Sequence, residues 1–262
     1  MFEDLNPGAA AETAVSDDFD FCIEQSQDGI TSAVLALATS FGTVDLRTAF
    51  NAFETMYEEH DGLPSALLTM VAVSEGAFSS TGRTLAAFHE FTNSYDQLPA
   101  AVLTIASNIR GSSAQVKSDM ENILSQARSD SLPSAVLTLA VTLQEDMTGV
   151  VQSFKYFREQ GADMLTSSLL TVASQVGGDS SQTVNDRYMA FASGEAPGFD
   201  AYDSLPAAFM TLSTCTSPNF TIDNLQSVVE SKSDFDTITS ALIAVAASVR
   251  ANGNNRGFLS PR

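Results

Sequence analysis

One short motif occurs seven times along this chain of 262 residues. Each copy begins with an aspartate, has Leu or Ile two residues later, and then has Pro or Thr. The seven aspartates are Asp28, Asp61, Asp96, Asp130, Asp163, Asp203 and Asp236. They are 33, 35, 34, 33, 40 and 33 residues apart, which is the period of a repeated helical hairpin. The chain is therefore predicted to stack similar helical units side by side.

The first helix of each unit is predicted to be apolar on two sides. Apolar residues stand six, seven and nine positions after the aspartate, while Ala or Ser predominates at positions four and five. A helix with two apolar sides has to lie between neighbouring helices, and the small residues allow a close approach. We expect these helices to form an inner layer. The aspartate is suited to cap each helix, and a first-turn Pro lacks an N–H that would otherwise be unpaired.

The segments between the motifs predict a second, amphipathic helix in each unit. Residues 46–57, 84–91 and 150–157 carry apolar residues at spacings of three and four, as expected for helices with one buried face. Gly42, Gly76, Gly111, Gly149 and Gly177 lie between the two kinds of helix, where a helix end favours glycine. The last copy ends after its first helix, near residue 250.

The repeat also predicts the domain organisation. Residues 1–27 are expected to form an acidic N-terminal segment with a capping helix, residues 28–250 one helical-repeat domain, and residues 251–262 a basic C-terminal tail. The long spacing before Asp203 contains the Gly/Pro-rich segment 193–200, which is typical of an inserted loop. Such an insertion often marks a contact surface.

Two segments carry a resemblance to a known repeat family. Ala49-Phe50-x-x-Phe53-x-x-Met56 and Thr166-Ser-Ser-Leu-Leu170 resemble the two helices of pentatricopeptide repeats and, more broadly, of tetratricopeptide-like hairpins. The resemblance covers about residues 28–250. It implies an all-α, right-handed α-solenoid of about seven hairpin repeats of 33–35 residues, with the first helix of each hairpin lining a concave surface. In pentatricopeptide proteins a side chain near the start of that helix reads one RNA base.

The positions that align best with the base-reading site are not suited to that role. They are Ala33, Ala66, Ala101, Ala135, Ser168, Ala208 and Ala241. Because alanine offers no hydrogen bond to a base edge, the resemblance indicates architecture and not an RNA code.

Charge and composition disfavour two classes of partner. The formal net charge of −20 would repel nucleic acid phosphates and anionic lipid headgroups. There is no apolar run long enough to span a membrane and no signal-peptide pattern at the N-terminus. Cys22 and Cys215 lie near opposite ends of the predicted array, too far apart for a disulfide. We expect a soluble, intracellular protein.

No catalytic motif is found in the sequence. Phosphate-binding glycine loops, nucleophile elbows and zinc-binding motifs are missing, and His60 and His89, the only histidines, lack neighbours suited to hold a metal. We therefore expect no enzyme activity, no cofactor and no metal, although an enzyme that uses carboxylates alone is an alternative.

Two features are candidate partner-binding sites. Threonines eight positions after the aspartate could align into a hydroxyl stripe: Thr69, Thr104, Thr138, Thr171 and Thr211. The alternative is that each hydroxyl bonds a carbonyl of its own helix. The second candidate is the basic C-terminal region with Arg250, Arg256 and Arg262, through which copies could self-associate.

These observations favour a non-enzymatic scaffold. We expect the repeats to bind protein partners or to form a structural subunit of a larger assembly. The alternative is an RNA-binding pentatricopeptide-type protein, which would need a basic groove despite the acidic composition.

Overall fold

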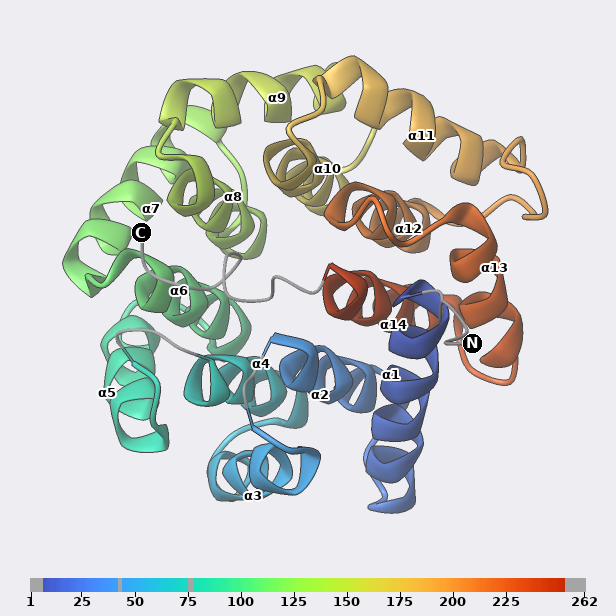
Figure 1. Cartoon of the computed structure of the whole chain (residues 1–262). Helices are drawn as coiled ribbons and strands as arrows, with labels where there is room; N and C mark the ends of the chain where they lie inside the picture. The colour runs from blue at the N-terminus through green and yellow to red at the C-terminus, as the bar shows by residue number, and fades with distance from the viewer. Residues whose placement is uncertain (1–6, 42–43, 75–77, 253–262) are drawn as a thin grey trace.

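The chain folds into helices alone in the computed structural model, which describes residues 7–41, 44–74 and 78–252 (Figure 1). Fourteen helices occur in these residues, and they form two layers. The inner helices are α2 (Gly29–Phe41), α4 (Gly62–Val73), α6 (Gln97–Arg110), α8 (Ser131–Gln144), α10 (Met164–Gly177), α12 (Ser204–Thr216) and α14 (Thr237–Ala251). The outer helices are α1 (Pro7–Glu24), α3 (Leu46–Tyr57), α5 (Thr81–Thr92), α7 (Ser113–Ala127), α9 (Met147–Glu159), α11 (Ser181–Ser193) and α13 (Ile222–Ser231).

The inner helices form a closed ring. Each packs against the next, and the last inner helix, α14, packs against the first, α2 (Figure 1). The open array expected from the repeat is therefore wrong in one respect, because its two ends meet. The outer helices surround the ring, and α1 supplies the outer partner that α14 lacks in its own repeat.

Small residues make the contacts between adjacent inner helices possible. The alanines and the serine five positions after each aspartate are completely buried. A Cβ atom added at Gly29 of α2 would lie 2.9 Å from Thr239 Oγ1 of α14, and one at Gly62 of α4 would lie 3.1 Å from Thr31 Oγ1 of α2. One side of every inner helix thus faces its predecessor, including across the closure. The residues seven positions after the aspartate are buried, Leu68 and Leu103 among them.

Helix α1 stabilises the contact between the first and last inner helices through charged and aromatic side chains. Asp18 accepts hydrogen bonds from Thr39 of α2 (2.7 Å) and from Arg250 of α14 (2.8 Å), so one carboxylate joins both closing helices. Nearby, the Phe19 ring stands at 88° to that of Phe235, with the ring centroids 4.9 Å apart. The Lys232 ammonium lies 5.1 Å from the centroid of the Phe19 ring.

The inserted segment fills a gap in the outer layer. Residues 194–203 follow α11, and within them Ala196 and Phe199 are buried. Phe199 contacts Phe191 of α11, and Gly198 has a positive φ of 82° and approaches Gln226 of α13 closely. The insertion thus lies between α11 and α13 and acts as a structural spacer.

The glycines predicted to end helices do so only in part. Gly111 ends α6 in the left-handed conformation, as predicted, whereas Gly149 lies inside α9. After α10 the left-handed residue is Gly178 and not Gly177. Gly42 and Gly76 lie outside the described residues. In the part of the chain that the structure describes, none of the helices has the length and apolar character needed to cross a membrane.

Candidate functional site at one rim of the ring

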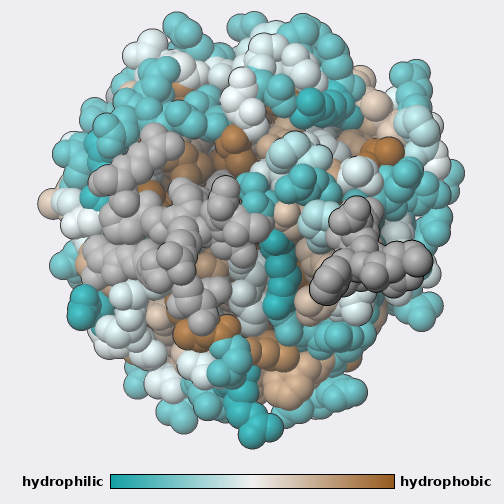
Figure 2. Space-filling view, in the orientation of Figure 1, coloured by the Kyte–Doolittle hydropathy of each residue, from teal (hydrophilic) through white to brown (hydrophobic). Residues whose placement is uncertain are grey.

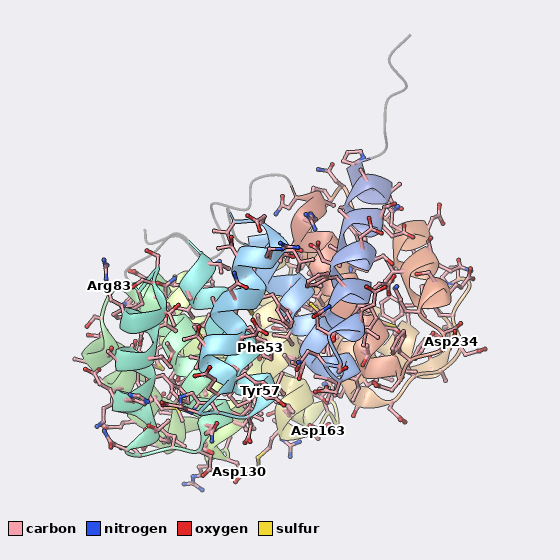
Figure 3. All side chains as sticks on the ribbon, turned by 90° about the horizontal axis from the view of Figure 1, so that it is seen from below. Phe53, Tyr57, Arg83, Asp130, Asp163 and Asp234 are labelled. Atoms are coloured by element: carbon pink, nitrogen blue, oxygen red, sulfur yellow. The ribbon has the colours of Figure 1, made fainter. Side chains whose placement is uncertain are left out.

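The seven motif aspartates lie at one rim of the ring. Because the inner helices alternate with outer helices that run back, all seven inner helices begin at the same rim. Figure 3 shows Asp130 and Asp163 at this rim, with Arg83 near the opposite one. All seven side chains are exposed, and we call them the acidic collar: Asp28, Asp61, Asp96, Asp130, Asp163, Asp203 and Asp236.

Three collar aspartates cap their helices with two hydrogen bonds each. Asp28 accepts from the backbone N–H of Thr31 (3.0 Å) and from its hydroxyl (2.6 Å), and Asp163 and Asp236 do the same with the threonine three residues later. These are the copies with Thr in the motif. The carboxylate therefore pairs one of the free N–H groups of the helix start.

The other four collar aspartates form no side-chain cap. Asp61, Asp96, Asp130 and Asp203 precede helices with Pro at the third position, which has no N–H to donate. Their carboxylates are still favoured by the positive end of the helix dipole. The predicted cap is thus confirmed for the Thr copies and wrong for the Pro copies, where the motif leaves the carboxylate without a bond to its helix.

A ring of aliphatic residues lies beside the collar. Two positions after each aspartate the side chain is half-buried, and we call these residues the aliphatic ring: Ile30, Leu63, Leu98, Leu132, Leu165, Leu205 and Ile238. They share a helix face with the residues six and nine positions after the aspartate. This face points to the ring axis, since the other sides of the helix contact the two neighbours and the outer layer. The rim therefore combines a central apolar surface with seven negative charges.

The predicted hydroxyl stripe is not accessible. All five threonines are completely buried, and each hydroxyl donates to the carbonyl four residues earlier at 2.8–2.9 Å. The Thr138 hydroxyl also lies 3.5 Å from the Met120 sulfur of the outer helix α7, so it is enclosed by the packed layers and is not on a partner surface. The alternative explanation from the sequence, a hydrogen bond within the helix, accounts for Thr69, Thr104, Thr138, Thr171 and Thr211.

Replacing Thr138 by valine tests this structural role. Valine keeps the shape and removes the hydroxyl, which donates to the Ser134 carbonyl at 2.8 Å and lies 3.5 Å from the Met120 sulfur, so the free energy of unfolding should fall by about 0.5–1.5 kcal/mol. Chemical denaturation followed by circular dichroism measures the change. The variant should retain any protein partner as well as the wild type does. A partner that binds the wild type but not the folded Thr138→Val variant would contradict a purely structural role.

The predicted basic tail is only partly within the described residues. Arg250 belongs to α14 and forms an ion pair with Asp18 of the same chain. It is therefore engaged in closing the ring. Arg256 and Arg262 lie outside the described residues.

The positions aligned with base reading are also inaccessible. Ala33, Ala66, Ala101, Ala135, Ser168, Ala208 and Ala241 have no exposed surface. They form the contacts between adjacent inner helices.

The two histidines lie together, which the sequence did not indicate. The ring centroids of His60 and His89 are 5.8 Å apart, and His60 also contacts Phe88. His60 is half-buried and His89 exposed. No group of three or more potential metal ligands occurs in the described residues.

Both cysteines are buried free thiols. Burial, with a smaller contribution from Asp18, raises the pKa of Cys22 to about 12, and burial also raises the pKa of Cys215. A thiol that stays protonated is a poor nucleophile.

We expect the two native thiols to react with a disulfide reagent at pH 8 far more slowly than the thiols of the denatured chain. The raised folded-state pKa values also imply that stability falls as pH rises above about 9, where the thiols of the unfolded chain ionise first. Absorbance assays with and without guanidinium measure the thiol reaction. Rapid reaction of both thiols in the native protein would contradict this burial.

Comparisons with protein-family models, with curated proteins and with solved structures find no match for this chain.

Proposed function

We propose that the chain is a non-enzymatic, helical-repeat binding protein that holds a protein partner at its acidic rim or serves as a subunit of a larger assembly. The observation that supports this proposal is the acidic collar around the aliphatic ring. A surface that offers the same pair of groups seven times suits a partner with basic and aliphatic side chains. Charge complementarity of this kind favours both encounter and specificity. We also propose that the repeats stack with the right-handed twist of pentatricopeptide repeats and that the protein is intracellular.

The four Pro-type aspartates make a sharp test possible. Asp61, Asp96, Asp130 and Asp203 form no cap, so changing all four to asparagine removes four charges without removing a helix-capping bond. We expect the wild-type chain to retain a specific protein from native lysate at low salt and the fourfold variant to lose it. The matched control changes exposed acids away from the collar, Glu54, Glu90, Glu121 and Asp186, to their amides. The proposal would be contradicted if the wild type, the fourfold variant and the control retained the same amount of the lysate protein, or if the wild type retained no protein.

Self-association through the C-terminal region is a separate part of the proposal. Deletion of residues 253–262 leaves the pair between Arg250 and Asp18 intact and removes Arg256 and Arg262. If these arginines bind the acidic surface of another copy, the deletion should convert any oligomer to a monomer in light scattering. An oligomer that persists after the deletion would exclude the tail as its cause.

The RNA-binding alternative has less support. A pentatricopeptide-type protein presents its base-reading side chains on an open concave surface, whereas the corresponding positions here are buried between helices of a closed ring. The collar adds negative charge to the rim. Filter binding at low salt tests this alternative directly, since phosphate contacts are strongest there.

A further inference from the structure

The two histidines form a pair that the proposed protein binding does not use. His60 immediately precedes Asp61 of the collar, in the turn between α3 and α4, and His89 lies in the last turn of α5. The pair therefore lies at the collar rim, whereas Figure 2 shows the opposite rim, where patches of apolar surface lie among polar residues. The two imidazoles belong to successive repeats, and their ring centroids are 5.8 Å apart. A ligand bound by both rings would join these two repeats.

Contacts of the backbone and of the ring hold His60 in place. Its backbone N–H donates to the Met56 carbonyl at 3.2 Å, and the N–H of the next residue, Asp61, donates to Gln97 Oε1 at 3.2 Å. The imidazole packs edge to face with Phe88, whose side chain has no exposed surface, at a centroid distance of 4.9 Å. The imidazole is thus positioned before any ligand binds, which lowers the entropic cost of binding.

One ring nitrogen of His60 is buried without a partner. Its Nε2 atom forms no hydrogen bond with any of the described residues. Buried polar atoms of folded proteins nearly always have a partner, so an unpaired one indicates that a further group binds there, such as a water molecule or an ion. A neutral imidazole has one nitrogen with a free lone pair, which suits it to bind Zn²⁺, Ni²⁺ or Cu²⁺. His89 is exposed, so a metal ion can reach the pair from solvent.

The separation of the two rings fits a pair of imidazoles on one ion. A metal–nitrogen bond of about 2.1 Å places the centroid of an imidazole about 3.2 Å from the ion. Two such centroids are about 5.2 Å apart when the nitrogens are at a tetrahedral angle, and about 6.4 Å apart when they lie on opposite sides of the ion. The observed 5.8 Å lies between these two values.

The residues next to the pair in sequence favour a cation. Glu58 and Glu59 precede His60, Glu90 follows His89, and all three are exposed. Since no group of three potential metal ligands is found in the described residues, these carboxylates attract a cation by their charge and do not complete its coordination. We propose that His60 and His89 together bind one divalent transition-metal ion of the Zn²⁺ and Cu²⁺ class, with water at its remaining positions. This binding needs no protein partner.

Binding of Cu²⁺ to the purified full chain, without an affinity tag, tests the proposal near neutral pH. Cu²⁺ binds nitrogen ligands most strongly among the divalent ions of the first transition row, and this chain has only two histidines to supply imidazole. We expect calorimetry to give one Cu²⁺ per chain and electron spin echo envelope modulation to detect two bound imidazoles. Zn²⁺ should compete for the site, whereas excess Ca²⁺, which prefers oxygen ligands, should not. Fewer than two imidazoles in the wild type, or displacement of Cu²⁺ by Ca²⁺, would overturn the proposal.

Two single variants separate the imidazoles from the acidic surface. His89→Gln removes an exposed ligand, so the fold should be kept while the affinity for Cu²⁺ falls at least about tenfold and one imidazole remains in the spectrum. The matched control is Glu90→Gln, which removes the neighbouring charge but no imidazole and should weaken binding less than about threefold. Circular dichroism checks that both variants are folded. If folded His89→Gln binds Cu²⁺ as tightly as the wild type, or if Glu90→Gln weakens binding equally, the histidine pair does not hold the metal.

Discussion

Replacing Phe19 by alanine is expected to lower the free energy of unfolding by about 4 kcal/mol. The Phe19 side chain has no exposed surface and contacts Phe235, a residue more than 200 positions away in sequence. It also lies under the ammonium group of Lys232, whose side chain is only 7% exposed and paired with Asp20. Truncation leaves a cavity and removes the aromatic ring beside a nearly buried charge. Guanidinium unfolding followed by circular dichroism at 222 nm measures the loss.

Phe21→Ala provides the matched control for this prediction. Phe21 lies on the same helix but is half-buried and contacts Phe50 of α3, away from the closure. Its truncation should therefore cost clearly less. If α1 were only a cap at the end of an open array, truncation of Phe19 would merely fray that end, and a loss below about 1 kcal/mol would be observed.

Enlarging a residue between inner helices is the second change with a large expected effect. Ala101 of α6 is completely buried on the side that faces α4, the side on which Asn108 bonds Ser74. Leucine adds three carbon atoms where the helices are in contact, so Ala101→Leu should lower the free energy of unfolding by about 1–3 kcal/mol, or more if the ring cannot widen. Thermal and chemical unfolding check this value.

Ala86→Leu is the control for Ala101→Leu. Ala86 is exposed on the outer helix α5, so the same enlargement there should change stability by less than about 0.5 kcal/mol. Equal effects at the two positions would show that the inner helices are not in close contact at Ala101.

The periodicity of the sequence predicted the helices well. The outer helix expected at residues 46–57 is α3 with the same bounds, and every inner helix begins immediately after its motif aspartate. This agreement has a physical cause, because capping, first-turn Pro and apolar spacing are local properties. They act in the same way in each copy.

The closure of the ring is a non-local property, and the repeat alone did not reveal it. A signal was nevertheless present. Among the described helices, α1 is an outer helix that is not preceded by an inner one, and α14 is an inner helix that is not followed by an outer one. These two halves complete each other, and Asp18 joins them through Thr39 and Arg250.

The threonines predicted to form a partner-binding stripe are buried, and the proposed binding surface lies at the rim instead. The threonine pattern is real, but each buried hydroxyl bonds the backbone of its own helix, and periodicity alone does not distinguish this role from exposure. The residues that do lie at the rim, the collar and the aliphatic ring, belong to the motif itself. The sequence predicts a helix cap for every motif aspartate, yet four of the seven aspartates form no cap.

The distance across the closure tests the central claim, that the first and last helices meet. Nitroxide labels attached through Glu24→Cys and Asp234→Cys would lie on exposed positions next to the closure, and the native thiols are buried. Double electron–electron resonance should give one distance below about 25 Å, since α1 packs directly against α13 and α14. A distance near 50 Å, about six helix spacings, would show an open array and contradict the closed ring.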